Sequence, residues 1–334
     1  MGYSPNQIAR TYGLNSSDSG KGETIAIIDA FGSPTIANDI SVFDNQFAIS
    51  KIHLKVIYLD SLRINEINRA WGLETSSDVE WAHAIATKAN ILLIVANSSS
   101  RQSLLNAIDY ATSHGANVIS CSWHFKEFRT ETQFDTHFNH NGIVYISTVG
   151  DRTLNAVWPA SSPYVMSIGG TTLILKKNGA YKTEYNWIGS GGGKSKFESR
   201  PVYQNIIKSL VGNNRGIPDV SWDANPETGF AVYDSSFASG SKWIEDGGTS
   251  IGAPCWAGIV AIIDQRSNVH LSSKQLLTDL YNIYSSKKKY RLLFHAIRFN
   301  INTNNTLSGY NFSTGLGTPK LKLLIPFLTS KTTH

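Results

Sequence analysis

Charged residues are scarce in this chain, where Asp, Glu, Lys and Arg make up 16% of 334 residues. That share is low for a cytosolic protein and suits a chain that must tolerate extensive protonation. A formal net charge of +5 could suit a nucleic-acid partner, but the basic residues are scattered. The densest run is Lys287–Lys289, which we interpret as a solvated loop. We expect no nucleic-acid partner, with nucleic-acid binding the weaker alternative.

Cysteine and long apolar runs are scarce too. Only Cys121 and Cys255 occur, both in apolar stretches, and we expect buried thiols, with a disulfide as the alternative. No stretch approaches the roughly 18 apolar residues of a membrane span, and no signal-like segment begins the chain. We therefore expect no membrane partner. If the protein is secreted, this chain is a mature or trimmed form.

Short apolar, β-branched runs recur through the first half of the chain and predict strands. Segments with helical spacing lie between them. Continuous apolar strands that alternate with amphipathic helices are typical of a parallel sheet covered on both faces. The expected strands are Thr24–Ile28, Leu54–Leu59, Ile91–Val95, Asn117–Ser120, Ile143–Ser147 and Val165–Ile168, and the expected helices are Ile36–Phe47, Ser76–Lys88, Ser103–Ser113 and Gln133–His140.

The pattern changes after Thr171, where polar and glycine-rich segments precede an almost wholly apolar run, Ile251–Ile263. That run predicts a helix buried on all sides. With no internal repeat, the chain reads as one domain over residues 1–334. The fold class is α/β, a doubly wound, mostly parallel sheet with helices on both faces.

Ser250 stands at the tight entry to this buried helix, in Gly-Gly-Thr-Ser. Unpaired backbone N–H groups and the positive end of the helix dipole could stabilise an oxyanion there. Ser250 could instead be only an N-cap. The small residues that follow it favour a nucleophile.

Three further segments carry acids that could serve such a serine. Glu74 and Asp78 are four residues apart, so on a helix they would share one face and could share a proton. Asp151 and Asp29 each end an apolar strand, which is where sites lie in doubly wound sheets. Each of these acids could instead have an ordinary structural role as a surface, turn or cap residue.

Taken together, the motifs resemble the catalytic domain of the sedolisin family, the serine-carboxyl peptidases that include the kumamolisin-like enzymes. The similarity runs from Tyr3 to Pro319, nearly the whole chain, and implies a subtilisin-like fold. Eight matching pieces in register make it specific: Ile25–Asp29, Glu74–Asp78, Ser120–Trp123, Val149–Asp151, Trp158–Pro163, Gly189–Gly193, Gly216–Val220 and Gly248–Pro254.

The resemblance implies a role for each matched residue. Ser250 would be the nucleophile of a serine endopeptidase, Glu74 its general base and Asp78 the residue that orients Glu74. Asp151 would complete the oxyanion hole with the Ser250 N–H. Asp29, in a place often held by glutamate, and Trp123 would extend the hydrogen-bond network. The segment that would line the substrate cleft comprises Ser190, Gly191, Gly192 and Gly193.

This chemistry requires acid. An aspartate donates a hydrogen bond to an oxyanion only while protonated, whereas a glutamate base must be ionised. We therefore expect an acid-acting endopeptidase, a monomer in an extracellular or other acidic compartment. Its partners would be protein or peptide substrates and its own cleaved prodomain.

Two other functions stay open. A subtilisin-type Asp/His/Ser protease would need a histidine segment that opens a helix, and the nearest candidate, His83, is better interpreted as a packed or capping residue. An inactive peptide-binding relative would lack one of the four functional side chains, and all four are present. A phosphate-binding loop at Gly193-Lys194-Ser195 would need glycine at Ile188.

The resemblance also implies a C-terminal calcium site, from which this chain departs. Ala296 and Asn311 stand where the family has two aspartates, with Ile297 and Gly309 beside them, and no acid follows Asp279. Calcium favours oxygen ligands that include carboxylates. We expect this site to be lost and no cofactor to be required.

Overall fold

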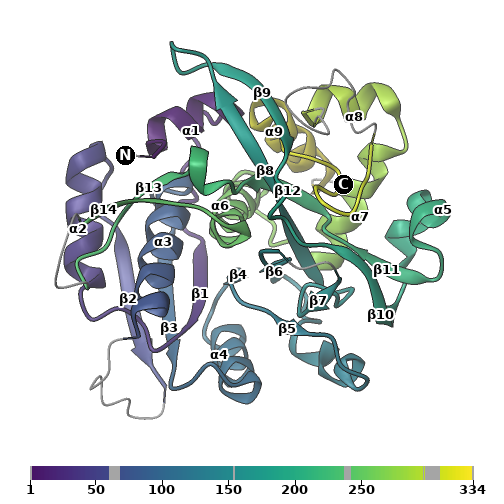
Figure 1. Cartoon of the computed structure of the whole chain (residues 1–334), viewed down its shortest axis with the longest axis horizontal. Helices are drawn as coiled ribbons and strands as arrows, with labels where there is room; N and C mark the ends of the chain where they lie inside the picture. The colour runs from purple at the N-terminus through teal and green to yellow at the C-terminus, as the bar shows by residue number, and fades with distance from the viewer. Residues whose placement is uncertain are drawn as a thin grey trace.

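The computed structural model describes residues 2–59, 68–152, 155–236, 242–295, 297 and 309–332. Its centre is a mostly parallel sheet in the order β12-β8-β6-β4-β1-β3-β2, with β9 paired antiparallel to β8. Figure 1 shows this sheet running through the molecule with helices before and behind it. The strands are β1 Thr24–Ala30, β2 His53–Tyr58, β3 Asn90–Ala96, β4 Val118–Cys121, β6 Val144–Thr148, β8 Val165–Leu175, β9 Tyr181–Asn186 and β12 Val220–Asp223.

Alternate side chains of the central strands enter two separate cores. On β1, Ile25 and Ile27 face one core, whereas Ala26 and Ile28 face the other. Successive strand residues point to opposite faces, so burial on both faces explains the continuous apolar runs in the sequence. The predicted doubly wound fold is confirmed.

The helices are α1 Pro5–Tyr12, α2 Ile36–Phe47, α3 Arg69–Ile85, α4 Arg101–Ser113, α5 Lys208–Val211, α6 Thr249–Ser267, α7 Ser273–Tyr284, α8 Lys287–Leu293 and α9 Leu321–Thr332, with 3₁₀ turns η1 Glu131–His137, η2 Val202–Ile207 and η3 Pro226–Thr228. Helices α3 and α6 supply side chains to the first core, and α4 to the second. The apolar helix predicted from Ile251 is α6, and nearly all of its residues are buried. No helix within the described residues combines the length and apolar character of a membrane span.

Three predicted boundaries were wrong. Helix α3 begins at Arg69, seven residues before the predicted start, because the side chain of Asn68 accepts a hydrogen bond from the Trp71 amide at 3.3 Å and caps the helix. The segment predicted as a helix from Gln133 is the 3₁₀ turn η1. The three lysines from Lys287 are exposed but open α8 instead of forming a loop, since Ser286 caps that helix.

Two short ribbons project from the sheet and reach the candidate site. One pairs β10 Gly193–Ser199 with β11 Asn214–Ile217, and the other pairs β13 Phe230–Tyr233 with β14 Trp243–Asp246. A third small pair joins β5 Phe125–Lys126 to β7 Val157–Trp158. Figure 1 places β10, β11 and α5 at the end of the molecule opposite α2 and β2.

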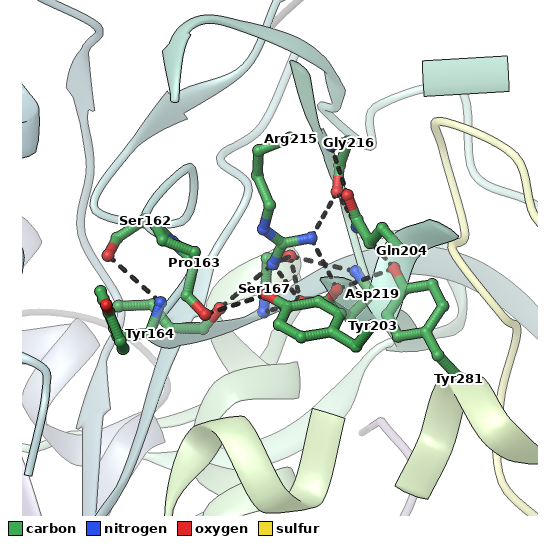
Figure 2. A network of polar contacts seen from close by, with 11 residues as sticks. Ser162, Pro163, Tyr164, Ser167, Tyr203, Gln204, Arg215, Gly216, Asp219 and Tyr281 are labelled. Atoms are coloured by element: carbon green, nitrogen blue, oxygen red, sulfur yellow. Dashed lines mark hydrogen bonds and ion pairs between the residues drawn. The ribbon is translucent and has the colours of Figure 1, made fainter. Parts of the chain in front are cut away.

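A buried ion pair fastens the β11 end of the first ribbon to the sheet (Figure 2). Arg215 binds both carboxylate oxygens of Asp219, at 2.8 and 2.6 Å, and both side chains are fully buried. The same carboxylate accepts hydrogen bonds from the amide and hydroxyl of Ser167 on β8, each at 2.8 Å, and from the Tyr281 hydroxyl at 2.9 Å. Because these donors satisfy the carboxylate inside the protein, the pair ties β11 and β12 to β8 and α7.

Carboxyl groups connect the other strand of this ribbon to the segment that follows β5. The Glu127 carboxylate accepts hydrogen bonds from the Ser195 hydroxyl and from the Lys196 amide at 3.1 Å. Glu131 accepts from the Ser161 hydroxyl at 2.9 Å. Glu198 is 3% exposed, and its Oε1 has no hydrogen-bond partner within the described residues.

Glu198, which lies on β10, makes the stability of the folded protein sensitive to pH. Burial, together with the nearby Asp135, Glu131 and Glu127 charges, raises the pKa of Glu198 to about 8. The folded-state value therefore lies above that of an unfolded glutamate, about 4.3. The stability that protonated Glu198 contributes is present in acid and is lost as the pH rises from about 4.3 toward 8.

We expect Glu198→Gln to raise the melting temperature at pH 7.5 and to change it little at pH 4. Glutamine keeps the shape of the neutral acid and cannot ionise, so only the neutral-pH penalty disappears. Thermal unfolding at the two pH values measures the difference. Glu227→Gln, at an exposed glutamate, is the matched control. An equal change at both pH values would contradict this account.

Candidate active site

Ser250 is the second residue of α6, and the N-cap is Gly248, with φ 113°. Ser250 is therefore not the N-cap. The first N–H groups of a helix have no intrahelical acceptor, so the Ser250 amide lies among the donors at the positive end of the α6 dipole. A positive φ favours glycine, and a Cβ at position 248 would come within 2.8 Å of the Asp151 carboxylate. This tight turn at Gly248 therefore places Ser250 in the first turn of α6, close to Asp151.

Glu74 and Asp78 both lie on α3, one turn apart as predicted. The Ser122 hydroxyl, just after β4, lies 2.9 Å from Asp78 Oδ1 and 3.2 Å from the backbone oxygen of Ser250. Ser122 thus links Asp78 to the turn that carries Ser250. Glu74 Oε1 and Asp78 Oδ2 have no hydrogen-bond partner among the described residues. Glu74 and Asp78 are therefore held on one helix, and one carboxylate oxygen of each has no hydrogen-bond partner among the described residues.

Burial dominates the electrostatics of these acids. It raises the pKa of Glu74 well above its ordinary value, and the nearby Asp29 and Asp246 carboxyls add to the rise. The Ser250 hydroxyl opposes it as a hydrogen-bonding group. Burial likewise raises the pKa of Asp78, to which Asp29 and Glu74 contribute. Each of these carboxyls disfavours the ionised form of its neighbours, so their protonation states depend on one another.

The predicted supporting residues lie behind this pair. Asp29 ends β1 fully buried, and burial raises its pKa while the Thr75 hydroxyl on α3 lowers it. Trp123 donates its indole N–H to the Ile28 backbone oxygen at 2.9 Å. The structure therefore brings Asp29 next to the two α3 acids. Trp123 contacts the strand that carries Asp29.

Asp151 follows β6 and faces the start of α6. Its Oδ1 accepts hydrogen bonds from the Thr249 amide at 2.9 Å and from the Thr249 hydroxyl at 2.8 Å. The Thr249 hydroxyl also contacts that of Thr148. Asp151 is itself exposed. One carboxylate oxygen thus anchors the Asp151 side chain to the residue that precedes Ser250.

The Ser190–Gly193 segment runs beside Asp151. Ser190 pairs with Asp151 in an isolated β-bridge, and the Gly191 amide donates to the Gly150 oxygen at 3.0 Å. The Ser190 hydroxyl is used within the protein, since it donates to the Ser313 oxygen at 2.8 Å. A Cβ at Gly192 would lie 1.8 Å from the Phe312 oxygen. This segment can therefore offer backbone groups to a ligand.

A cleft of about 270 Å³ opens at Glu74 and is lined by Ala70, Trp71, Glu74, Ser122, Trp123 and His124. The His124 ring rests on Gly150, where a Cβ would come within 2.5 Å of it. Burial lowers the pKa of His124, and the Asp151 charge opposes this effect. The cleft brings aromatic rings to the general-base candidate.

The sequence interpretation missed several residues that hold these groups. Ser122 and Thr249 adjoin predicted site residues and were signalled only by small polar side chains inside the matched motifs. Ser77 likewise lies inside the matched motif Glu74–Asp78, whereas Thr148 lies outside the matched motifs and carried no sequence signal. Asp246 directly precedes the Gly-Gly-Thr-Ser motif, which is the signal that could have drawn attention to it.

The other sequence candidates lie elsewhere. His83 is fully buried, 2.9 Å from the Ser50 oxygen and 3.2 Å from Asp44, so it is a packed residue as predicted. Lys194 and Ser195 lie on strand β10. Cys121 and Cys255 are both buried free thiols, which confirms the first interpretation and excludes the disulfide.

The residues at the family's calcium positions do not fit that ion. The Asn311 Oδ1 accepts hydrogen bonds from the Ser313 and Thr314 amides at 2.9 and 3.0 Å, and its Nδ2 donates to the Thr314 hydroxyl at 2.7 Å. The side-chain oxygen thus closes its own turn. Ile297 is a buried apolar residue, Gly309 packs on the Tyr284 ring, and Ala296 lies outside the described residues.

Known proteins resemble this chain in sequence and in fold. The subtilase family model matches residues 67–316. Sedolisin of Pseudomonas sp. (strain 101) is 25% identical over 95% of this chain, and kumamolisin of Bacillus sp. (strain MN-32) is 27% identical over 79%. Tripeptidyl-peptidase 1 of Dictyostelium discoideum is 26% identical over 94%. The chain spans 58, 52 and 55% of these relatives, respectively.

A solved structure matches nearly the whole fold. Pseudomonas sedolisin, a serine-carboxyl proteinase in complex with two molecules of pseudo-iodotyrostatin, superposes with a TM-score of 0.86. The match covers 99% of both chains at 24% identity. The family model and the fold agree over most of the chain. It belongs to the subtilase family, and it is similar in sequence to sedolisin and kumamolisin and in fold to sedolisin.

Proposed function

We propose that this protein is a serine-carboxyl endopeptidase that hydrolyses peptide bonds of proteins in acid. The observation that carries the proposal is the placement of Ser250 at the start of α6. There its hydroxyl is a hydrogen-bonding group for the buried Glu74 carboxyl and lowers the pKa of that acid. Of the described residues that line the cleft, His124 is the one histidine, and its ring rests on Gly150. A carboxyl is therefore the base that this geometry favours.

In the proposed acylation step, the Ser250 hydroxyl oxygen attacks the scissile carbonyl carbon while Glu74 takes its proton. Glu74 then delivers that proton to the leaving amine. Because Asp29, Glu74 and Asp78 share protons, the set can carry one negative charge in acid without ionising fully. Asp78, held by Ser122, would keep Glu74 in place.

The developing oxyanion would be stabilised by the Ser250 amide and by Asp151. Fixed donors aimed at the oxyanion form one of the strongest contributions to acyl transfer. Thr249 fixes Asp151 Oδ1, so the other oxygen could donate while it carries a proton. Backbone groups of Ser190, Gly191, Gly192 and Gly193 would bind the substrate chain along the cleft.

The first prediction concerns pH. Cleavage of a quenched peptide should peak well below neutrality, because Asp151 must hold a proton while the Glu74 set carries a charge. Ser250→Ala should lower kcat by roughly 10⁶, as expected for loss of a nucleophile. A pH–rate profile from pH 2 to 9 measures both. An optimum at neutral or alkaline pH would favour a subtilisin-type mechanism.

A second prediction separates two roles of Asp151. Asp151→Ala removes the proposed donor and should reduce kcat about 10²–10³-fold, the usual loss for one oxyanion-hole group. Asp151→Asn retains a donor that does not titrate, so it should keep more activity and lose less of it as the pH rises. Near-wild-type rates in both variants would show that Asp151 is only a turn residue.

The proposal extends to setting and partners. An acid optimum suits an extracellular or other acidic compartment, and Pseudomonas sedolisin was solved with a ligand in place, which is consistent with peptide-like substrates. We propose that the protein acts as a monomer and that a cleaved prodomain is a further partner. An inactive peptide-binding relative remains the alternative that the rate measurements would reveal.

We also propose that the protein works without calcium. The side-chain oxygen of Asn311 already accepts hydrogen bonds from two amides of its own turn. A calcium site made of amide and carbonyl oxygens alone would carry no formal charge. Calcium affinity depends on the number of charged ligands. The hydrogen bonds within residues 311–314 hold that turn together without an ion.

The third prediction tests this loss. A ligand held at 100 times its Kd adds about 2.7 kcal/mol to the stability of the native state, so removal of a bound calcium ion would lower the melting temperature by several degrees. We expect no such drop when Ser250→Ala protein is unfolded in excess chelator and in millimolar calcium at one pH. A fall of several degrees on chelation would contradict the proposal.

A further inference from the structure

Asp246 is an acid beside the proposed site to which no role has been assigned. It is the last residue of β14, it pairs with Phe230 on β13, and it lies four residues before Ser250. The Gly229 backbone packs on the Asp246 backbone oxygen, where a Cβ would lie only 2.1 Å away. The position of Asp246 is therefore fixed by the β13–β14 ribbon.

Side chains of α3 hold this ribbon. Glu80 accepts a hydrogen bond from the Tyr233 amide at 3.1 Å, and Trp81 donates to the Ala231 oxygen at 3.1 Å. The third attachment uses Asp246 itself, whose Oδ2 accepts the Ser77 hydroxyl at 2.5 Å. Ser77 stands between Glu74 and Asp78 on the same helix. The Asp246 carboxyl is thus bound to the turn of α3 that carries Glu74 and Asp78.

Charge connects Asp246 to the base. Its carboxyl acts electrostatically on Glu74 and on Asp78. The other groups that act on Glu74 are Asp29 from β1, Asp151 from the loop after β6 and the Ser250 hydroxyl from α6. Burial raises the pKa of Asp246 itself, while the Ser77 hydroxyl and the Gly247 amide favour its ionised form.

We propose that Asp246 is a positioning residue of the peptidase reaction, held by Ser77 so that its negative charge acts on the general base Glu74. This inference rests on the proposed function. Among the described residues, the ribbon attachments made by Glu80 and Trp81 involve no group of the site, whereas the bond from Ser77 joins the base-bearing helix to the turn that leads to Ser250.

The sign of the effect follows from electrostatics. While it is ionised, Asp246 disfavours the ionised form of Glu74, so it keeps Glu74 protonated to a higher pH and makes it a stronger base once ionised. The Ser77 hydroxyl and the Gly247 amide favour the ionised Asp246 that this effect requires. Removing the charge should move the acid limb of the kcat/KM profile to lower pH and reduce the plateau rate. A residue that only shaped the turn would lower the rate equally at all pH values.

The experiment compares Asp246→Asn with wild type across the acid range. Asparagine keeps an acceptor for Ser77 and removes the charge. We expect the acid limb of kcat/KM to move down by roughly half a pH unit or more, which is about a threefold gain relative to the plateau at a pH well below the limb. Glu245→Gln is the matched control, since this exposed neighbour loses the same charge, and its profile should not move.

A second readout does not depend on activity. In Ser250→Ala protein with ¹³C-labelled glutamate carboxyls, the Glu74 signal, assigned with Glu74→Gln, should titrate at lower pH when Asp246→Asn is added. An unmoved acid limb with a uniformly lower rate, or an unmoved Glu74 titration, would overturn the inference. If wild-type protein hydrolyses no peptide at any pH, the proposed function fails, and the titration alone decides the role of Asp246.

Discussion

Helix α6 is buried along nearly its whole length. The sheet and helix α3 must therefore pack closely against it. Glycines allow the close contacts: a Cβ at Gly252 would lie 2.7 Å from Ile168 on β8, and one at Gly258 would lie 2.8 Å from Ile85 on α3. Helix α3 therefore packs directly on α6. Because Ser250 starts one helix and Glu74 lies on the other, this packing sets the distance between them.

The second constraint is that the site collects carboxyl groups inside the protein. Asp29, Glu74 and Asp78 are wholly or largely enclosed, and the groups that act on them are other acids and hydroxyls. The buried Arg215–Asp219 pair shows the contrasting solution, in which a cation and several donors satisfy the carboxylate. Without such a cation, protonation is what makes burial tolerable. Stability and the proposed chemistry both favour acid for this one reason.

Particular elements show how far the sequence could be followed. The strands and the buried helix were predictable because burial on both faces leaves continuous apolar runs. The start of α3 was not, since the expected helix began at Ser76 and the Asn68 side chain, which accepts from the Trp71 amide, begins it seven residues earlier. The turn η1 has helical spacing, but its Glu131 carboxylate is drawn to the Ser161 hydroxyl, and no local pattern reports a partner 30 residues away.

The sequence by itself determined the fold class and the family, and it proposed Ser250, Glu74, Asp78 and Asp151 as site residues, because motif order and periodicity are local properties of the chain. Only the tertiary structure decided what surrounds them. Ser122, Thr249 and Asp246 reach the site from three separate elements, and hydrogen bonds between distant segments leave no trace in spacing. The proton affinity of each acid depends on burial and on neighbouring charge, so it exists only once the chain has folded.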